Sequence, residues 1–162
     1  MTITVGTALP DATLLLMGDK GSEGVSMAAR LKGRKVVIFG LPGAYTGTCT
    51  TSHVPSFMRV ADKLRAKGVD EIICLSVNDP FVMKAWGEST GAAAKGITFL
   101  ADGDASFTKA IGMAYTVPSN AFFDRSKRYA LYAVDGVVKV LNKGQETRAC
   151  EISGGEAMLD AI

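Results

Sequence analysis

The chain has no long hydrophobic run and no excess of one charge. None of its 162 residues belongs to a stretch near the roughly 18 consecutive apolar residues that a membrane span requires. Its 18 Lys and Arg residues face 16 Asp and Glu residues, which leaves a net charge of +2. The longest basic cluster, residues 125–128, is short and interrupted by serine. We therefore expect a soluble protein with neither a membrane nor a nucleic acid as partner.

Cysteine and histidine are scarce. The three cysteines, Cys49, Cys74 and Cys150, are odd in number and widely spaced, which argues against the disulfide scaffold of a secreted protein and favours a reducing compartment. A zinc site would need all three together with His53, and their spacing matches no zinc motif, so we expect no metal. We also expect no cofactor.

Residues 1–10 contain no basic residue and no apolar stretch of the kind that signal peptides carry. We therefore expect neither a signal peptide nor a transit peptide, and a cytoplasmic location unless an organellar presequence has been removed. Repeats, low-complexity tracts and linkers are also lacking. This predicts a single domain over residues 1–162, long enough to bury about two thirds of its unfolded surface.

What the chain does contain is an alternation of apolar strands and helical segments. The expected strands cover residues 14–17, 36–39, 72–77, 97–101, 129–134 and 137–141, and the expected helices cover a brief segment after Ser26, residues 49–67, 81–89 and 107–111, and the C-terminal segment from Ser153. Residues 18–24 are expected to form a polar turn. This order predicts an α/β fold of thioredoxin type, with a central mixed sheet and helices on both faces.

Several single residues refine these boundaries. Asp79 followed by Pro80 predicts a helix start, and Ser153 with Glu156 three residues later has the spacing of a capping box. Asp135 and Gly136, between two apolar strands, predict a tight hairpin. Pro55 should kink the helix that contains it.

The segment 42–49, with the sequence PGAYTGTC, is the strongest functional signal in the chain. It leaves a buried strand through a glycine-containing loop and delivers Cys49 to the start of a helix. Unpaired backbone N–H groups and the positive end of the helix dipole stabilise negative charge there. Thr46, three residues earlier, can place a hydroxyl beside the sulfur. The pattern predicts a reactive thiolate at Cys49.

These residues resemble the peroxiredoxin family, and most closely its type II branch, also called type V. The resemblance extends over essentially the whole chain. It rests on PxxxTxxC at residues 42–49, HVPSF at 53–57, LSVND at 75–79, KRY at 127–129 and DGVV at 135–138.

The resemblance implies a thiol peroxidase that reduces hydrogen peroxide and alkyl hydroperoxides without a metal or organic cofactor. Cys49 would be the peroxidatic cysteine and become a sulfenic acid. Thr46 and Arg128 would activate it, and Pro42 would shield the pocket. Thioredoxin, glutaredoxin or glutathione would supply the electrons, and a homodimer is expected.

The sequence does not decide which thiol reacts with the sulfenic acid. Plant-like members of the branch have a second cysteine 25 residues after the first, which matches Cys74, and animal-like members use one near the position of Cys150. Direct reduction by an external thiol is the third alternative.

Many relatives carry proline at the position of Gly47 and phenylalanine at that of Tyr45. Gly47 should make the turn around Cys49 easier to unwind.

Other functions remain to be weighed from the residues alone. His53 lies four residues after Cys49 and could act as its general base, as in thiol hydrolases, although a supporting hydrogen-bond role fits helix geometry better. Residues 49–52 also match the CxxS pattern of monothiol disulfide oxidoreductases. A non-catalytic thioredoxin-like binding module is a further alternative, because a fold does not determine a function.

Overall fold

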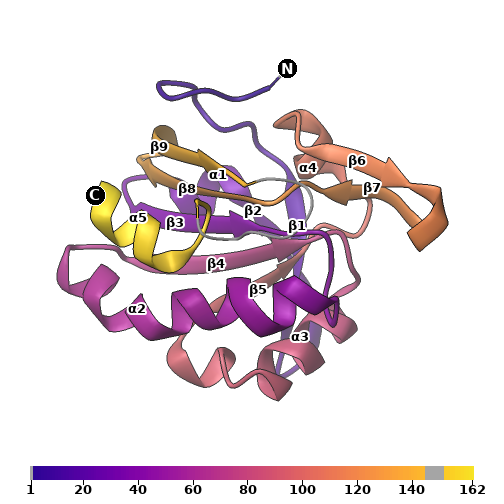
Figure 1. Ribbon diagram of the computed structural model, residues 1–162. Coiled ribbons are helices and arrows are strands. Elements are labelled where there is room, and N and C mark those ends of the chain that lie inside the picture. Colours follow the sequence, from indigo (N-terminus) through magenta and orange to yellow (C-terminus); the bar gives the residue numbers. More distant parts are fainter. Residues whose placement is uncertain (1, 145–151) are drawn as a thin grey trace.

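The protein is described by a computed structural model that covers residues 2–144 and 152–162. Its centre is a seven-stranded mixed sheet in the order β2-β1-β5-β4-β3-β8-β9, and a two-stranded sheet, β6-β7, stands beside it (Figure 1). The strands are β1 (Thr13–Gly18), β2 (Gly21–Ser26), β3 (Lys35–Gly40), β4 (Glu71–Ser76), β5 (Thr98–Ala101), β6 (Ala114–Val117), β7 (Phe122–Ser126), β8 (Tyr129–Val134) and β9 (Val137–Lys143). The α-helices are α1 (Met27–Leu31), α2 (Val54–Ala66), α3 (Pro80–Ser89), α4 (Ser106–Ala110) and α5 (Gly155–Ala161).

The middle of the sheet is parallel and its edges are antiparallel. β3 pairs in parallel with β4, and β4 with β5. β8 and β9 extend the sheet in antiparallel fashion on one side, and β1 and β2 on the other. Asp135 and Gly136 turn the β8–β9 hairpin with φ angles of 50° and 76°. The predicted mixed sheet and hairpin are confirmed.

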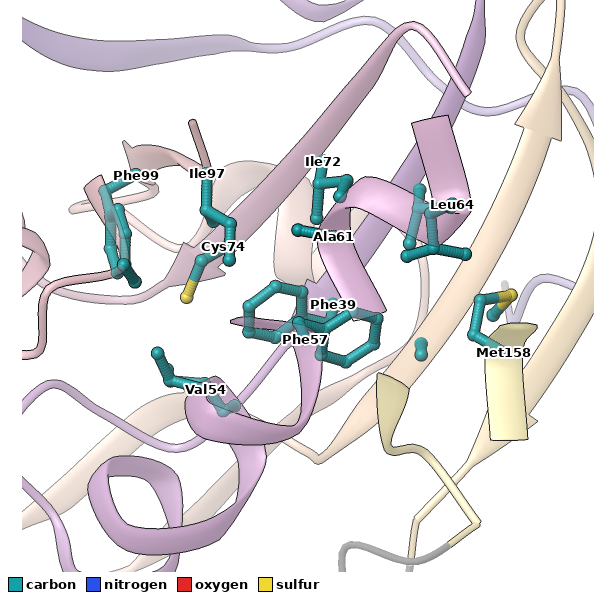
Figure 2. Packing of buried hydrophobic residues seen from close by; sticks show 14 of the residues in the cluster. Phe39, Val54, Phe57, Ala61, Leu64, Ile72, Cys74, Ile97, Phe99 and Met158 are labelled. Atoms are coloured by element: carbon teal, nitrogen blue, oxygen red, sulfur yellow. The ribbon is translucent and has the colours of Figure 1, made fainter. Parts of the chain in front are cut away.

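Side chains alternate between the two faces of the sheet and form two separate cores. Phe39 and Cys74 face the side covered by α2, α3 and α5, where they pack with Phe57 and other buried residues (Figure 2). Ile38 and Leu75, one residue along each strand, face the side covered by α1 and α4. Helices therefore cover both faces, as predicted.

Two predicted helix starts are confirmed. The Ser26 side chain accepts from the backbone N–H of Ala29 at the start of α1, and Asp79 accepts from that of Val82 at the start of α3. No helix in the described ranges is long and apolar enough to cross a bilayer.

The prediction of a polar turn over residues 18–24 is wrong for its second half, because residues 21–24 belong to β2. This strand lies at the edge of the sheet and is largely exposed, so it carries no apolar alternation that sequence could reveal. The β6–β7 hairpin was not predicted either, because it lies outside the main sheet.

The predicted capping box at Ser153 is also wrong. The N-cap of α5 is Gly154, and the buried Ser153 hydroxyl has no hydrogen-bond partner among the residues that the structure describes. Glu156 instead forms an ion pair with Arg59 of α2 (2.7 Å).

Candidate active site

Cys49 begins a π-helical turn, Cys49–His53, that leads directly into α2. The backbone N–H of Val54 donates to the carbonyl of Cys49, five residues back, which defines the wide turn. The predicted kink at Pro55 is wrong, because Pro55 lies in the first turn of α2, where proline is tolerated, and the π turn precedes it. The Cys49 side chain is only 1% exposed.

Arg128 reaches this sulfur from the segment between β7 and β8. Its Nη2 donates to the Cys49 Sγ at 3.3 Å, although the two residues are 79 positions apart. The residue is only 7% exposed, and within the described part of the chain it forms no ion pair with a carboxylate. A buried cation is costly unless its N–H groups are hydrogen-bonded, and the Cys49 sulfur accepts one of these hydrogen bonds.

His53 is fully buried and contacts Arg128. Its Nε2 is 2.9 Å from the Ser153 carbonyl oxygen, which can only accept, so Nε2 carries the hydrogen. The lone pair on Nδ1 then accepts from Arg128 Nη1 at 3.0 Å. Burial, and then the charge of Arg128, lower the pKa of His53 to about 3 against the opposing effect of the Ser153 carbonyl. His53 is therefore a neutral acceptor for Arg128.

This arrangement argues against the alternative of a Cys/His nucleophilic pair. A general base for Cys49 needs a free ring nitrogen within hydrogen-bond reach of the sulfur. Both ring nitrogens of His53 are already engaged, by Arg128 and by Ser153. The sequence suggested no partner that could orient His53, and the partner is a backbone carbonyl, which composition cannot reveal.

Thr46 and Pro42 lie in the loop that precedes the π turn. The Thr46 hydroxyl donates to the carbonyl of Gly43 at 2.7 Å, and the Thr46 carbonyl accepts from the N–H of Thr50 at 3.0 Å. Both Thr46 and Pro42 line a cavity of about 430 Å³ together with Arg128. The structure thus brings Cys49, Thr46, Arg128 and Pro42 into one region of the molecule.

The β6–β7 hairpin also lines this cavity, which was not predicted. Its lining residues are Tyr115, Val117, Asn120 and Phe122. Arg125, on the same hairpin, donates from Nη1 to the Pro42 carbonyl at 3.0 Å, and its guanidinium lies 5.1 Å from the Phe122 ring centre. In the sequence Arg125 was only one member of a short basic cluster.

The two candidate resolving cysteines are Cys74 and Cys150. Cys74 is a free, fully buried thiol on β4, and burial raises its pKa, with a further contribution from Cys49. Figure 2 shows its side chain pointing to the side of the sheet that Val54 and Phe57 cover. Cys150 lies outside the described residues.

Across residues 2–144 and 152–162, no three His, Cys, Asp or Glu side chains lie close enough together to hold a metal ion.

Comparison with known proteins assigns the chain to a family. A family model described as Redoxin matches residues 4–159. The chain is 46% identical to the chloroplastic peroxiredoxin-2E-2 of Oryza sativa subsp. japonica, over 99% of this chain and 73% of that protein. It is 44% identical to peroxiredoxin-2C of the same plant, over 99% and 98% of the two chains. The crystal structure of reduced Prx3 from Vibrio vulnificus in complex with hydrogen peroxide matches with a TM-score of 0.92 at 44% identity, over 99% of each chain.

The chain therefore belongs to the peroxiredoxins, within their type II branch, and has their thioredoxin-like fold. It is a thiol-dependent peroxidase. The sequence-based prediction of family, fold and enzyme class is confirmed.

Proposed function

We propose that Cys49 is the peroxidatic cysteine, that Thr46, Arg128 and Pro42 activate and shield it, and that His53 supports Arg128. The observation that carries this proposal is the contact between the Arg128 guanidinium and the Cys49 sulfur, 3.3 Å in length and buried from solvent. The same guanidinium also donates to His53 Nδ1, and this hydrogen bond fixes its position, so it does not need to reorganise during the reaction.

In the proposed reaction the Cys49 thiolate attacks one oxygen of the hydroperoxide. A sulfur–oxygen bond forms while the oxygen–oxygen bond breaks, and the leaving oxygen takes up a proton and departs as water or an alcohol. Sulfur is oxidised to sulfenic acid and the peroxide is reduced. Arg128 stabilises the negative charge that moves onto the leaving oxygen, which lowers the energy of the transition state more than that of the ground state.

Thr46 has a separate role in this proposal. Because its hydrogen is donated to the Gly43 carbonyl, its oxygen lone pairs remain able to accept a hydrogen bond from the O–H of the attacked peroxide oxygen. Pro42 has no backbone N–H and lines the cavity beside Thr46, so it limits the access of water to the thiolate.

The shape of the cavity supports hydroperoxides with apolar substituents as well as hydrogen peroxide. Hydrogen peroxide alone is far smaller than about 430 Å³, and Tyr115, Val117 and Phe122 contribute apolar surface to the lining that also contains Thr46. Burial of an alkyl or aryl group against that surface would stabilise the complex.

The return of the sulfenic acid to the thiol requires an external dithiol or thiol, which we propose to be thioredoxin, glutaredoxin or glutathione. Three routes are considered: condensation with Cys74, condensation with Cys150, or direct attack by the external thiol. In each, the thiol displaces water from the sulfenic acid to give a disulfide, which thiol exchange then reduces. Since Cys49 and Cys74 are both buried, the route through Cys74 requires the π turn to unwind.

We also propose a homodimer and a reducing compartment, cytoplasmic or organellar. Tyr45, in the loop before Cys49, is 56% exposed, and Phe81, in the first turn of α3, is 70% exposed. Large exposed apolar side chains beside a site are typical of interaction surfaces.

The decisive experiment follows peroxide consumption by Cys49→Ser, Cys74→Ser and Cys150→Ser with each reductant. Linked peptides are identified by mass after one equivalent of oxidant. Cys49→Ser should lose turnover with every reductant, and retained turnover would contradict the proposal. Loss of turnover with thioredoxin in one of the other variants would identify the resolving cysteine.

A further inference from the structure

The loop between β3 and Cys49 has a backbone conformation that it does not adopt unaided. Tyr45, a non-glycine residue, has a φ of +64°. Such a conformation persists only where the surrounding structure holds it. Two side chains distant in the chain form hydrogen bonds to the backbone of this loop: Asn78, which follows β4, and Arg125 of β7.

Asn78 fixes the peptide group between Gly43 and Ala44. Its Oδ1 accepts from the backbone N–H of Ala44 at 3.0 Å and also from the hydroxyl of Ser76, which holds the amide in place. The N–H of Ala44 and the C=O of Gly43 belong to one planar trans peptide and point in opposite directions. An acceptor on the N–H side therefore sets the direction of the Gly43 carbonyl.

The Gly43 carbonyl in turn sets the orientation of the Thr46 hydroxyl. It accepts the Thr46 hydrogen at 2.7 Å, so the direction of this carbonyl decides where the Thr46 lone pairs face. Asn78 thus acts on Thr46 through one rigid peptide group.

Arg125 fixes the preceding peptide group. Its Nη1 donates to the Pro42 carbonyl, and Phe122 lies under its guanidinium. A Cβ atom on Gly43 would lie 2.5 Å from this Nη1, so glycine is needed for the approach. Both peptide groups that flank Gly43 are therefore held by side chains from outside the loop.

We infer that Asn78 and Arg125 are positioning residues of the peroxidase site, which aim the Thr46 hydroxyl at the peroxide by fixing the two peptide groups around Gly43. The inference rests on the role proposed above for Thr46. Neither residue touches the reacting sulfur, so their effect falls on the reaction with peroxide and leaves thiolate formation at Cys49 to Arg128.

The test compares two reactions of the reduced protein: oxidation by hydrogen peroxide in stopped flow, and alkylation of Cys49 by iodoacetamide, which reports the thiolate alone. Asn78→Ala should slow oxidation about ten- to a hundredfold. Its alkylation rate should stay within about twofold of the wild type. Asn78→Asp keeps an acceptor oxygen and should recover most of the oxidation rate.

Arg125→Met and Arg125→Lys test the second contact by the same two readouts, and they keep the inference testable if Asn78→Ala does not fold. Arg125→Met should slow oxidation and not alkylation, and Arg125→Lys should recover part of the loss. The inference is overturned if both Asn78→Ala and Arg125→Met oxidise at the wild-type rate, or if oxidation and alkylation fall in parallel.

A double variant distinguishes the positioning role inferred for Asn78 from the role proposed for Thr46. If Asn78 acts through Thr46, Thr46→Val with Asn78→Ala should be no slower than Thr46→Val alone. A wild-type rate for Thr46→Val would refute the role proposed for Thr46. A slow Thr46→Val beside an unaffected Asn78→Ala would refute the positioning role of Asn78 and leave the proposed function intact.

Discussion

At the scale of single residues, His53 connects three distant parts of the chain. Its ring joins the π turn to Ser153 before α5 and to Arg128 before β8. A protonated imidazole has no lone pair to accept from Arg128, so the neutral form is essential to this arrangement. Burial beside a guanidinium keeps it neutral.

The shifted pKa of His53 predicts a loss of stability in acid. Its folded-state pKa, about 3, lies below the ordinary value of 6.5, so between these values the unfolded chain binds a proton that the folded chain does not. The free energy of unfolding should therefore fall as the pH falls through this window, by at most about 1.4 kcal/mol per pH unit from this residue.

Urea unfolding of the wild type and of His53→Gln measures this effect. Glutamine can donate to the Ser153 carbonyl and accept from Arg128 but does not titrate. The difference in stability between the two proteins should shift in favour of the variant as the pH falls from about 7 to about 5. Parallel curves would contradict the predicted pKa shift.

Sequence could predict those site residues that lie close together in the chain. Pro42, Thr46 and Cys49 share one loop, and their spacing is visible in the printed order. Arg128 came only from the family resemblance, because it reaches the sulfur across 79 positions. Backbone groups such as the Ser153 carbonyl are common to all residues and leave no signal.

At the scale of elements, the π turn is the part of the site that has to unwind in the proposed route through Cys74. Gly47 precedes it, is not among the glycines with a positive φ angle, and has open space where a Cβ would lie. Gly47→Pro should restrict the turn, with a stabilisation of about 0.4–1 kcal/mol and amide exchange at residues 48–53 about two- to fivefold slower.

Hydrogen exchange of reduced wild type and Gly47→Pro checks this prediction, with the amides of α4 as an internal control that should not change. Peroxide-driven resolution should also slow in the variant. If the wild-type turn exchanges no faster than the variant, the idea that Gly47 favours unwinding is wrong.

The contact between α5 and α2 supports His53 and gives a second prediction for the elements. A Cβ on Gly155 would lie 2.3 Å from the Ser56 carbonyl oxygen. Gly155→Ala should therefore destabilise the fold by roughly 1–3 kcal/mol, despite the higher helix propensity of alanine. By displacing Ser153 it should also slow peroxide reduction.

Thermal unfolding and stopped-flow oxidation test this variant. Gly47→Ala is the matched control for stability, because its Cβ would meet no atom within 4 Å. Equal stability of Gly155→Ala and Gly47→Ala would contradict the proposed close packing.

Prediction of the elements succeeded where burial was continuous. β3 and β4 are apolar along nearly their whole length because both faces of the sheet are covered. β2 is mostly exposed and β7 is only partly buried, and neither carries such a pattern. The π turn was missed because its wide spacing depends on contacts to Arg128 and Ser153, which tertiary structure provides.

At the scale of the whole molecule, the exposed apolar residues near the site predict self-association. Sedimentation should show a concentration-dependent dimer, and Phe81→Glu should weaken it because a charge would be buried in the contact. Val5→Glu, at a residue 62% exposed in the N-terminal segment, is the matched control. A monomer at all concentrations, or equal effects of both variants, would contradict the proposed surface.

The single tryptophan connects α3 to the π turn. Trp86 is fully buried, and its indole N–H donates to the hydroxyl of Thr50, the residue after Cys49, at 3.2 Å. Unwinding of the turn would break this hydrogen bond and change the polarity around the indole. The protein therefore carries an intrinsic fluorophore beside the proposed peroxidatic cysteine, and its emission should follow each step of the catalytic cycle without any added label.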